Sequence, residues 1–307
     1  MKLENLAIDL SNIQVLRNKL NDFKKSGKFI ISYAEYYSLG SYYISSVADQ
    51  VYLYPEGMLD YRGLRTELMF FKGAIEKYGL DVQIIRGSGN DFKSAVEPFM
   101  YNKMSDENRF QLKSILTTLW NNMNQDIGDS RKITNNNLNQ IADSVLAYNA
   151  SGSLNLNLID ATLYEYELDS IVNSKLSLNE NEKLNKIPFK KYIKKQTSKK
   201  KFNFSKKSNI ALIYAVGEIR SGKNQEGVMG SETIVKAINK AKNDSSIKAI
   251  VLRVNSPGGS ALASDVIWRS LELAKKNKPV VVSMGSVAAS GGYYISCGAD
   301  RIFASAN

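Results

Sequence analysis

The sequence of 307 residues contains no histidine, and this absence excludes several kinds of catalytic site. A Ser-His-Asp or Cys-His hydrolase needs an imidazole as its general base, and a His-ligated zinc site needs one as a ligand. The single cysteine, Cys297, has no partner for an internal disulfide. No stretch approaches the about 18 consecutive apolar residues of a membrane span, and the start, MKLENLAIDL, lacks the basic-then-apolar layout of a secretory signal. We therefore expect no anchor and no leader in these residues.

The rest of the composition is that of a folded globular protein, with 43% hydrophobic and 23% charged residues. The formal charge of +11 is concentrated in residues 183–207, KLNKIPFKKYIKKQTSKKKFNFSKK, and the remainder is nearly balanced. Because the few apolar residues of this stretch show no sustained period, we predict an exposed linker between two domains. The alternative is a contact with membrane headgroups or nucleic acid.

Short apolar runs rich in β-branched residues alternate with helical patterns along the chain. The predicted strands are 82–85, 209–216, 248–254 and 279–284, and the last three have the continuity of buried parallel strands. The predicted helices begin at the N-caps Ser105, Ser231 and Ser260. Strand, helix, strand order implies right-handed crossovers and an α/β layered fold.

An internal repeat is the strongest sign of domain organisation. Residues 24–54 align without a gap on residues 275–305, at an offset of 251, with ten identical positions. The two copies differ at one chemically important place, because Ser290 in the second copy aligns with Leu39 in the first. We expect two copies of one unit, of which the second alone has a candidate nucleophile.

The segment SMGSVAASGGYYIS leads from a predicted strand through small residues into a helix that opens near Ser290. Small neighbours allow a sharp backbone turn, which exposes a serine oxygen. Upstream, Gly258 and Gly259 in NSPGGS follow another strand and can present backbone N–H groups to an oxyanion. Because the carboxyl ends of neighbouring parallel strands meet at one sheet edge, we expect the two turns to lie together.

Without histidine, a serine nucleophile needs another base, and lysine is the natural candidate. A lysine serves only where apolar surroundings lower its pKa from about 10.4 toward about 7 or 8. Lys93 has such a setting in DFKSAVEPFM, between Phe92 and Phe99. The alternative is an ordinary surface lysine whose stem lies on apolar neighbours.

Taken together, four motifs resemble the long, two-repeat form of the bacterial signal peptide peptidase family, the SppA type. They are NSPGGS, KPVVVSMGSVAASGGYYIS, FKSAVEPF and YLYPEGMLDYRGL. The resemblance implies a ClpP/crotonase-like α/β spiral of two tandem repeats and peptide-bond hydrolysis by a Ser/Lys dyad. By motif, Ser290 matches the nucleophile and Lys93 the general base, donated by the first repeat. The amides of Gly258 or Gly259 and of Gly291 match the oxyanion hole, and the resemblance implies no cofactor or metal.

The same resemblance implies a bowl of four identical subunits that degrades cleaved signal peptides at the bacterial inner membrane. It divides the chain into a degenerate repeat at 1–182, the linker at 183–207 and the start of a second repeat at 208–307. Both repeats are expected to be incomplete in this chain. Peptides and further copies of the chain are the expected partners, and nucleic acid is not.

Two other functions remain open. One is a non-catalytic scaffold that binds peptides or oligomerises, and the other is a crotonase-like acyl-CoA enzyme, which also uses paired amides against an oxyanion. Cys297 is expected to be a small buried residue, and Tyr293 and Tyr294, which recur at Tyr42 and Tyr43, are expected to pack their helix.

Overall fold

The computed structural model describes residues 1–3, 6, 8–87, 89–178, 182, 184–199 and 209–305. The chain divides into two compact units. Unit 1 consists mainly of Ile13–Ser177 together with Met1–Ile8, and unit 2 consists mainly of Leu178–Ala306 together with Asp9–Asn12. This division falls close to the start of the lysine-rich stretch.

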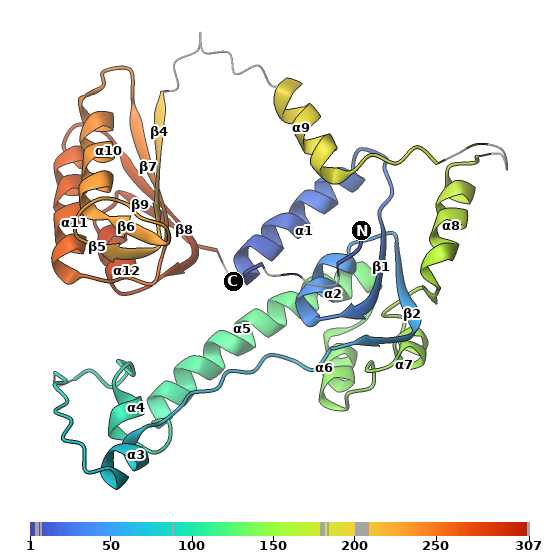
Figure 1. Ribbon diagram of the computed structural model, residues 1–307, viewed down its shortest axis with the longest axis horizontal. Helices are drawn as coiled ribbons and strands as arrows, with labels where there is room; N and C mark the ends of the chain where they lie inside the picture. The colour runs from blue at the N-terminus through green and yellow to red at the C-terminus, as the bar shows by residue number, and fades with distance from the viewer. Residues whose placement is uncertain are drawn as a thin grey trace. The chain divides into compact units, whose positions relative to one another are not determined.

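Unit 2 is built on a four-stranded parallel sheet in the order β4-β7-β8-β9 (Figure 1). The strands are β4 (Ile210–Val216), β7 (Ala249–Ser256), β8 (Val280–Ala288) and β9 (Arg301–Phe303), and a small second sheet pairs β5 (Glu218–Arg220) with β6 (Val228–Gly230). The helices are α10 (Ser231–Asn243), α11 (Ala261–Lys275) and α12 (Gly291–Cys297). The three strands predicted in this half and the parallel α/β class are confirmed.

Helices α10 and α11 cover one face of this sheet, and their apolar side chains form the core with the strands. Leu252, Val254, Val282 and Ile267 are completely buried there. The prediction that all these strands are fully buried is wrong for β4. On the other face of the sheet, four of its side chains are exposed: Ile210, Leu212, Tyr214 and Val216. No element of the described part of unit 2 covers that face of β4. This edge strand therefore exposes an apolar surface.

The predicted N-caps are confirmed at two helices and wrong at the third. Ser260 accepts a hydrogen bond from the amide of Ala263 at 3.2 Å, and Ser105 caps α5 in the same way. Ser231 is instead the first residue of α10, and Gly230 is its N-cap. A Cβ at position 230 would lie 2.2 Å from the carbonyl carbon of Lys223, so the close approach of this loop requires glycine at the cap.

Unit 1 has a three-stranded parallel sheet with helices around it. The strands are β1 (Ile31–Tyr37), β2 (Gln50–Leu59) and β3 (Ala161–Thr162), in that order. The helices around the sheet are α1 (Leu10–Lys24), α2 (Leu39–Ser45), α5 (Asp106–Arg131), α6 (Asn135–Asp143), α7 (Ala150–Asn155) and α8 (Leu168–Lys175), with a 3-10 turn at Glu165–Glu167.

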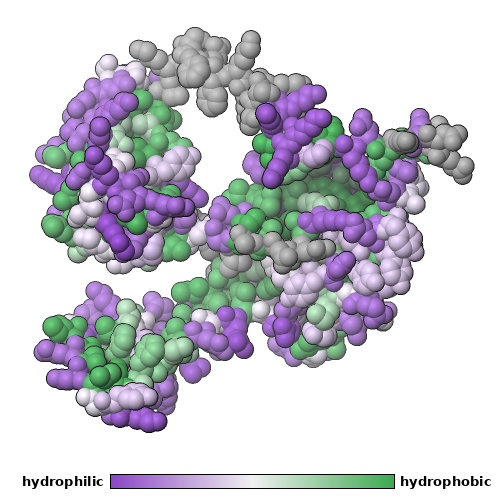
Figure 2. Space-filling model, viewed as in Figure 1, coloured by the Kyte–Doolittle hydropathy of each residue, from purple (hydrophilic) through white to green (hydrophobic). Residues whose placement is uncertain are grey.

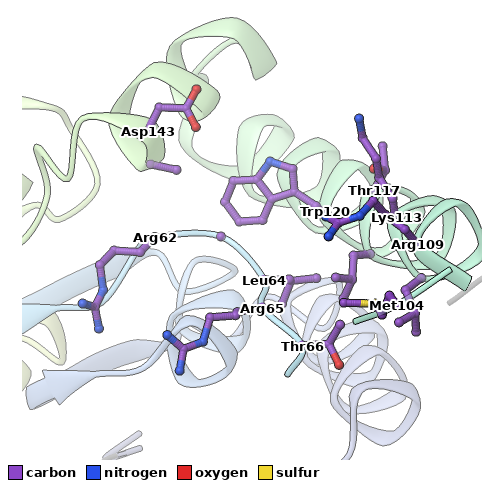
Figure 3. Close-up of a pocket in the computed structure, with 14 residues that line it drawn as sticks. Arg62, Leu64, Arg65, Thr66, Met104, Arg109, Lys113, Thr117, Trp120 and Asp143 are labelled. Carbon is purple, nitrogen blue, oxygen red and sulfur yellow. The ribbon is translucent and has the colours of Figure 1, made fainter. Parts of the chain in front are cut away.

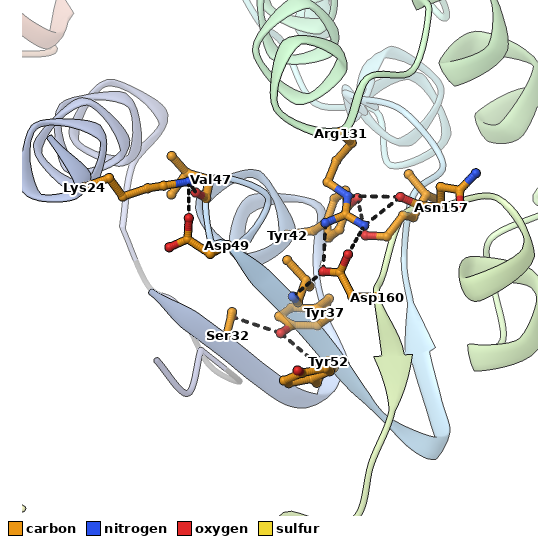
Figure 4. A network of polar contacts seen from close by, with 12 residues as sticks. Lys24, Ser32, Tyr37, Tyr42, Val47, Asp49, Tyr52, Arg131, Asn157 and Asp160 are labelled. Atoms are coloured by element: carbon orange, nitrogen blue, oxygen red, sulfur yellow. Dashed lines mark hydrogen bonds and ion pairs between the residues drawn. The ribbon is translucent and has the colours of Figure 1, made fainter. Parts of the chain in front are cut away.

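Polar side chains join the elements of unit 1 around this sheet (Figure 4). Arg131 at the end of α5 pairs with Asp160 at 2.9 Å and donates to the carbonyl of Asn157. Lys24 at the end of α1 pairs with Asp49 at 3.0 Å, ahead of β2. Because each pair joins elements far apart in sequence, they fix the helices against the sheet edge.

Residues 62–104 of unit 1, here called the arm, lie at the N-terminal end of α5, away from the sheet (Figure 1). The arm contains α3 (Lys72–Lys77) and α4 (Glu97–Met100), held together by stacking of Phe71 on Phe99 with ring centroids 5.6 Å apart. The strand predicted at 82–85 is wrong, since these residues form no strand and the side chain of Ile85 is 88% exposed. No strand of the described arm is available to pair with it.

Corresponding contacts in the two units support the repeat. The ammonium of Lys24 donates to the carbonyl of Val47 at 2.9 Å, and that of Lys275, 251 positions later, donates to Gly298 at 2.6 Å. Helices α2 and α12 each have seven residues. The strands depart from the gapless alignment by one residue: Ile31 pairs with Gln50, whereas Val281 pairs with Arg301.

The lysine-rich stretch contains a helix, α9 (Phe189–Lys199), where the sequence predicted a linker without regular pattern. The apolar residues Phe189, Tyr192 and Ile193 do have the i, i+3, i+4 spacing of one helical face, over a length too short to register as a sustained period. Residues 183 and 200–207 of the predicted linker lie outside the described residues. Among the helices of the described ranges, none combines the length and apolarity needed to cross a membrane.

Candidate active site

Ser290 lies in a sharp turn between β8 and α12. Its backbone angles, φ 49° and ψ −119°, are those of the first central residue of a type II′ turn, a position that favours glycine. The amide of Gly292 donates to the carbonyl of Ala289 at 2.8 Å and closes the turn. Ser290 itself is exposed, so the turn presents its hydroxyl to solvent at the carboxyl edge of the sheet. A side chain held in a glycine conformation beside a strand end is typical of a catalytic nucleophile.

The backbone at Gly258 lies directly against this turn. A Cβ added to Gly258 would lie 2.7 Å from the amide nitrogen of Gly291 and 2.8 Å from the Cβ of Ser290. Gly258 has φ 105° and Gly259 has φ 148°, conformations that other residues rarely adopt. The structure therefore brings together the predicted serine and the predicted glycine loop, as expected for two turns at one sheet edge.

Strand β5 holds the glycine loop in place. The amide of Ile219 donates to the carbonyl of Gly258 at 2.7 Å, and the amide of Ser260 donates back to Ile219 at 2.8 Å. A Cβ on Gly259 would lie 2.2 Å from the carbonyl oxygen of Ile219, so the loop can pack this closely only with glycine. Sequence reasoning missed β5 because a three-residue strand has too few residues to show a period.

The three candidate oxyanion amides differ in their hydrogen bonding. The amide of Gly258 donates to the hydroxyl of Ser256 at 3.2 Å. Within the part of the chain that the structure describes, the amides of Gly259 and Gly291 have no acceptor. Gly259 is exposed beside the turn, whereas Gly291 is buried. The open donors next to Ser290 are therefore those of Gly259 and Gly291.

Helix α12 differs from its expected burial. Cys297 is exposed, so the prediction of a buried residue is wrong, and Tyr293 is 55% exposed. Tyr294 donates to Asp265 at 2.7 Å and stacks on Trp268 with ring centroids 6.0 Å apart. In unit 1 the matching Tyr42 and Tyr43 are buried, because α5 and the segment before β3 cover α2. No described part of unit 2 covers α12 in this way.

Lys93 lies in the arm of unit 1, in an irregular segment ahead of α4. Its amide donates to the carbonyl of Asn90 at 2.9 Å, and its side chain is exposed. The neighbouring Phe92 is also exposed, so the apolar shelter that the sequence suggested for Lys93 is not formed within unit 1. Lys93 and Ser290 belong to different units.

Glu97 fixes the segment that carries Lys93, a role that the sequence did not reveal. Its side chain is fully buried and accepts hydrogen bonds from the hydroxyl of Ser105 at 2.5 Å and from Asn108 at 2.8 Å. Burial favours the neutral acid, but these hydrogen bonds hold the pKa of Glu97 below its ordinary value. The carboxylate thus joins α4 to the first turn of α5. In the sequence, the available signal was Glu97 followed by Pro98, a pair typical of the start of a short helix.

Helix α5 separates the arm from α2, the counterpart of α12 in unit 1. The C-terminal half of α5 packs on α2, where Tyr43 donates to Asp126. From Asp106 to Asp126 the helix rises about 30 Å. Lys93, ahead of the helix, therefore lies far along α5 from Leu39, the residue that aligns with Ser290.

A cavity of about 660 Å³ opens between α5 and the first residues of the arm (Figure 3). Its lining includes the basic residues Arg62, Arg65 and Lys113 and the indole of Trp120. The three cations give the cavity a basic character. Two of these charges already have carboxylate partners, since Arg62 pairs with Asp60 and Arg65 with Glu67. The cavity contains none of the predicted site residues, and its paired charges favour a structural role.

Comparison with known proteins identifies a family for this chain. The model of peptidase family S49 matches residues 22–176 and 272–307. The chain belongs to peptidase family S49. The two matched stretches begin 250 residues apart (272 minus 22), close to the repeat offset, and the second contains Ser290. The predicted resemblance to the SppA type is confirmed.

Relatives of the family resemble nearly all of this chain. Protease 4 of Haemophilus influenzae is 36% identical over 97% of the chain and 49% of its own length. Protease 4 of Salmonella typhi is 33% identical, and the chloroplastic serine protease SPPA of Arabidopsis thaliana is 30% identical over 99% of the chain and 45% of its own length. The chain spans about half the length of these relatives. Among solved structures, a ClpP1 mutant from Listeria monocytogenes matches 30% of this chain and 46% of its own, at 30% identity and a TM-score of 0.24.

Proposed function

We propose that this chain is a serine-type peptidase in which Ser290 is the nucleophile and Lys93 the general base. The observation that carries the proposal is the turn at Ser290, which holds a serine in a glycine conformation with open backbone amides beside it. Such strain persists only where the surrounding structure imposes it, and it clusters at active sites. Membership of peptidase family S49 supports the same reaction class.

In the proposed reaction, the unprotonated amine of Lys93 accepts the proton of the Ser290 hydroxyl as the oxygen attacks the scissile carbonyl. The tetrahedral oxyanion collapses and expels the amine of the leaving peptide, which takes the proton from the Lys93 ammonium. An acyl ester remains on Ser290. Water, deprotonated by the same lysine, then attacks the ester, and the serine oxygen leaves with that proton to release the carboxylic acid.

We assign the oxyanion hole to the amides of Gly259 and Gly291. Two open N–H donors aimed at the developing charge stabilise it without reorganisation, and loss of one such donor typically costs about 10²–10³ in rate. The amide of Gly258 is a weaker candidate because it already donates to Ser256. Its role in this proposal is to let the backbone approach the serine.

The exposed position of Lys93 implies that a further surface shelters the amine in the active enzyme. A lysine base must shed its proton, which requires removal from water. The arm that carries Lys93 exposes large apolar side chains, and green patches mark the arm in Figure 2. They are Leu68, Met69, Phe71, Tyr78, Leu80, Val82, Ile85, Phe92, Phe99 and Tyr101. A patch of this kind is typical of a protein interface, which supports assembly of several copies, four by family resemblance.

The proposed substrates are short apolar peptides such as cleaved signal peptides, and the proposed location is the bacterial inner membrane. Both follow from the resemblance to the SppA type. A non-catalytic peptide-binding scaffold is the alternative, and it differs in one measurable way: it needs no reactive serine.

Covalent labelling by a fluorophosphonate, read by intact mass, tests the proposal on the full chain. We expect one adduct on the parent protein and none on Ser290→Ala or Lys93→Ala. Ser245→Ala and Lys103→Ala are matched controls, because both residues are exposed and Lys103 lies in the same arm. The controls should label at the parental rate.

The pattern of labelling separates the outcomes. Labelling that survives Ser290→Ala would refute the assignment of the nucleophile. Labelling lost in Ser290→Ala but unchanged in Lys93→Ala would refute Lys93 as the base. A folded parent that binds apolar peptides and is never labelled would favour the scaffold.

A further inference from the structure

Helix α9 carries a concentration of charge that the proposed peptidase reaction does not use. Residues 183–207 contain 11 lysines and no acidic residue. The whole chain has 41 basic and 30 acidic residues, so the 30 basic residues outside this stretch (41 minus 11) balance the 30 acids. The entire formal excess of positive charge therefore lies on this short stretch.

Among residues 189–195 of α9, lysines and apolar side chains occupy two different faces of the helix. At 3.6 residues per turn, Phe189, Tyr192 and Ile193 fall within an arc of about 100°. Lys190, Lys191, Lys194 and Lys195 fall on the opposite side. The three apolar side chains are 76%, 47% and 44% exposed, which is unusual for aromatic and branched side chains of one helical stripe.

We propose that α9 binds an anionic lipid surface, with its axis in the plane of the interface. A largely polar helix that places lysines on one face and a few aromatic or branched residues on the other is the type that lies at the headgroup boundary. The apolar stripe enters the acyl boundary while the lysine stems extend outward to lipid phosphates. Hydrophilic residues gather at α9 in Figure 2.

Nucleic acid would satisfy the lysines equally well, but it would leave the apolar stripe without a role. Single-strand binding uses aromatic residues as stacking platforms on a basic surface, with bases and phosphates met on the same side. In α9 the aromatic residues and the lysine face point in opposite directions. The geometry thus favours a surface that is apolar inside and anionic outside, which describes a bilayer.

Vesicle co-sedimentation of the full chain tests this inference. We expect binding to vesicles of phosphatidylcholine mixed with phosphatidylglycerol, weaker binding to phosphatidylcholine alone, and weakening by added salt. The double variant Lys190→Gln/Lys194→Gln should bind the anionic vesicles about thirty-fold more weakly. The control Lys236→Gln/Lys240→Gln removes the same charge from exposed positions with the same spacing on α10, and it should bind like the parent.

A second pair of changes isolates the apolar stripe. Phe189→Ala/Ile193→Ala keeps every charge and a strong helix former at both positions, so a loss of binding cannot come from melting of α9. We expect at least about a ten-fold loss of binding. In addition, Tyr192→Trp should gain fluorescence that brominated lipids quench, because the new indole enters the acyl boundary.

Three results would overturn the inference. The first is anionic vesicle binding that survives Phe189→Ala/Ile193→Ala, which would make the contact purely ionic. The second is an equal loss of binding in the α10 control, which would reduce the effect to net charge. The third is tight binding of a single-stranded oligonucleotide that outcompetes the vesicles and depends on the α9 lysines. None of these assays depends on peptidase activity, so they stand or fall separately from the Ser290 assignment.

Discussion

Replacement of Ser290 by glycine should make unit 2 more stable than replacement by alanine, although both changes remove the hydroxyl of the proposed nucleophile. The two variants lack the same hydroxyl and differ only in the Cβ. At φ 49° and ψ −119° a Cβ is unfavourable, whereas glycine occupies this region freely. The difference between the variants therefore measures the conformational energy that the native turn stores at Ser290.

The expected size follows from two opposing effects. A non-glycine residue in a sparsely populated region costs about 1–3 kcal/mol, which glycine relieves. Glycine also loses more backbone entropy on folding than alanine, which takes back about 0.4–1 kcal/mol. The net gain of Ser290→Gly over Ser290→Ala is about 1 kcal/mol, or on the order of 4 °C in the melting temperature of a unit of this size.

Thermal and urea unfolding followed by Trp268 fluorescence measure this difference, in a background where Trp120 of unit 1 is replaced by phenylalanine. Trp268 reports on the right region because it stacks on Tyr294 of α12. The control is Ala288→Gly, which removes a methyl group where φ is negative and should destabilise by about 0.5–1 kcal/mol or more. If Ser290→Gly proves no more stable than Ser290→Ala, the turn is not strained and the main support for Ser290 as the proposed nucleophile fails.

Two further predictions concern the supports of the site. Gly258→Ala should destabilise unit 2 by at least about 2 kcal/mol and slow fluorophosphonate labelling, because the new Cβ would meet the amide of Gly291. The control is Gly222→Ala, at a similar φ of 91° but with open space around it, and it should cost only about 1 kcal/mol. Equal costs in urea unfolding would contradict the close contact. The depressed pKa of Glu97 means that its stabilising effect is complete above the unfolded value of about 4.3 and is lost as pH falls through the folded value. The stability difference between the parent and Glu97→Gln should therefore shrink below about pH 4 in thermal unfolding, and a constant difference would refute the role of the carboxylate.

The sequence predicted most of unit 2 because its elements follow simple local rules. Three apolar runs rich in β-branched residues became adjacent parallel strands, and the N-cap Ser260 began its helix, as Ser105 did for α5 of unit 1. The same local rules failed at 82–85, where VQII has strand composition but finds no strand to pair with in the described part of the arm. Strand propensity describes how well a residue fits a sheet, so it predicts nothing where no sheet is present.

The burial of repeated residues could not be predicted from the repeat. Tyr42 and Tyr293 occupy matching positions in α2 and α12, yet the first is fully buried and the second is 55% exposed. The hydroxyl of Tyr42 reaches the carbonyl of Leu158, more than a hundred residues away. Burial is set by such distant segments, and identity between two copies carries no information about what packs over each of them.

The strain at Ser290 was also beyond the reach of the sequence, and for an instructive reason. In ASGG, the residue types predict a turn with glycine at the positive-φ position, and both glycines follow the serine instead of replacing it. The structure gives the positive φ to the serine and leaves Gly291 and Gly292 with negative values, where alanine would satisfy the backbone. Those glycines are needed for space: a Cβ on Gly291 would lie 2.5 Å from the hydroxyl of Ser264, and one on Gly292 would lie 2.5 Å from the carbonyl of Ser256. The small residues thus allow α12 to pack tightly on the neighbouring turn, and this packing accompanies the strained conformation of Ser290, the proposed nucleophile.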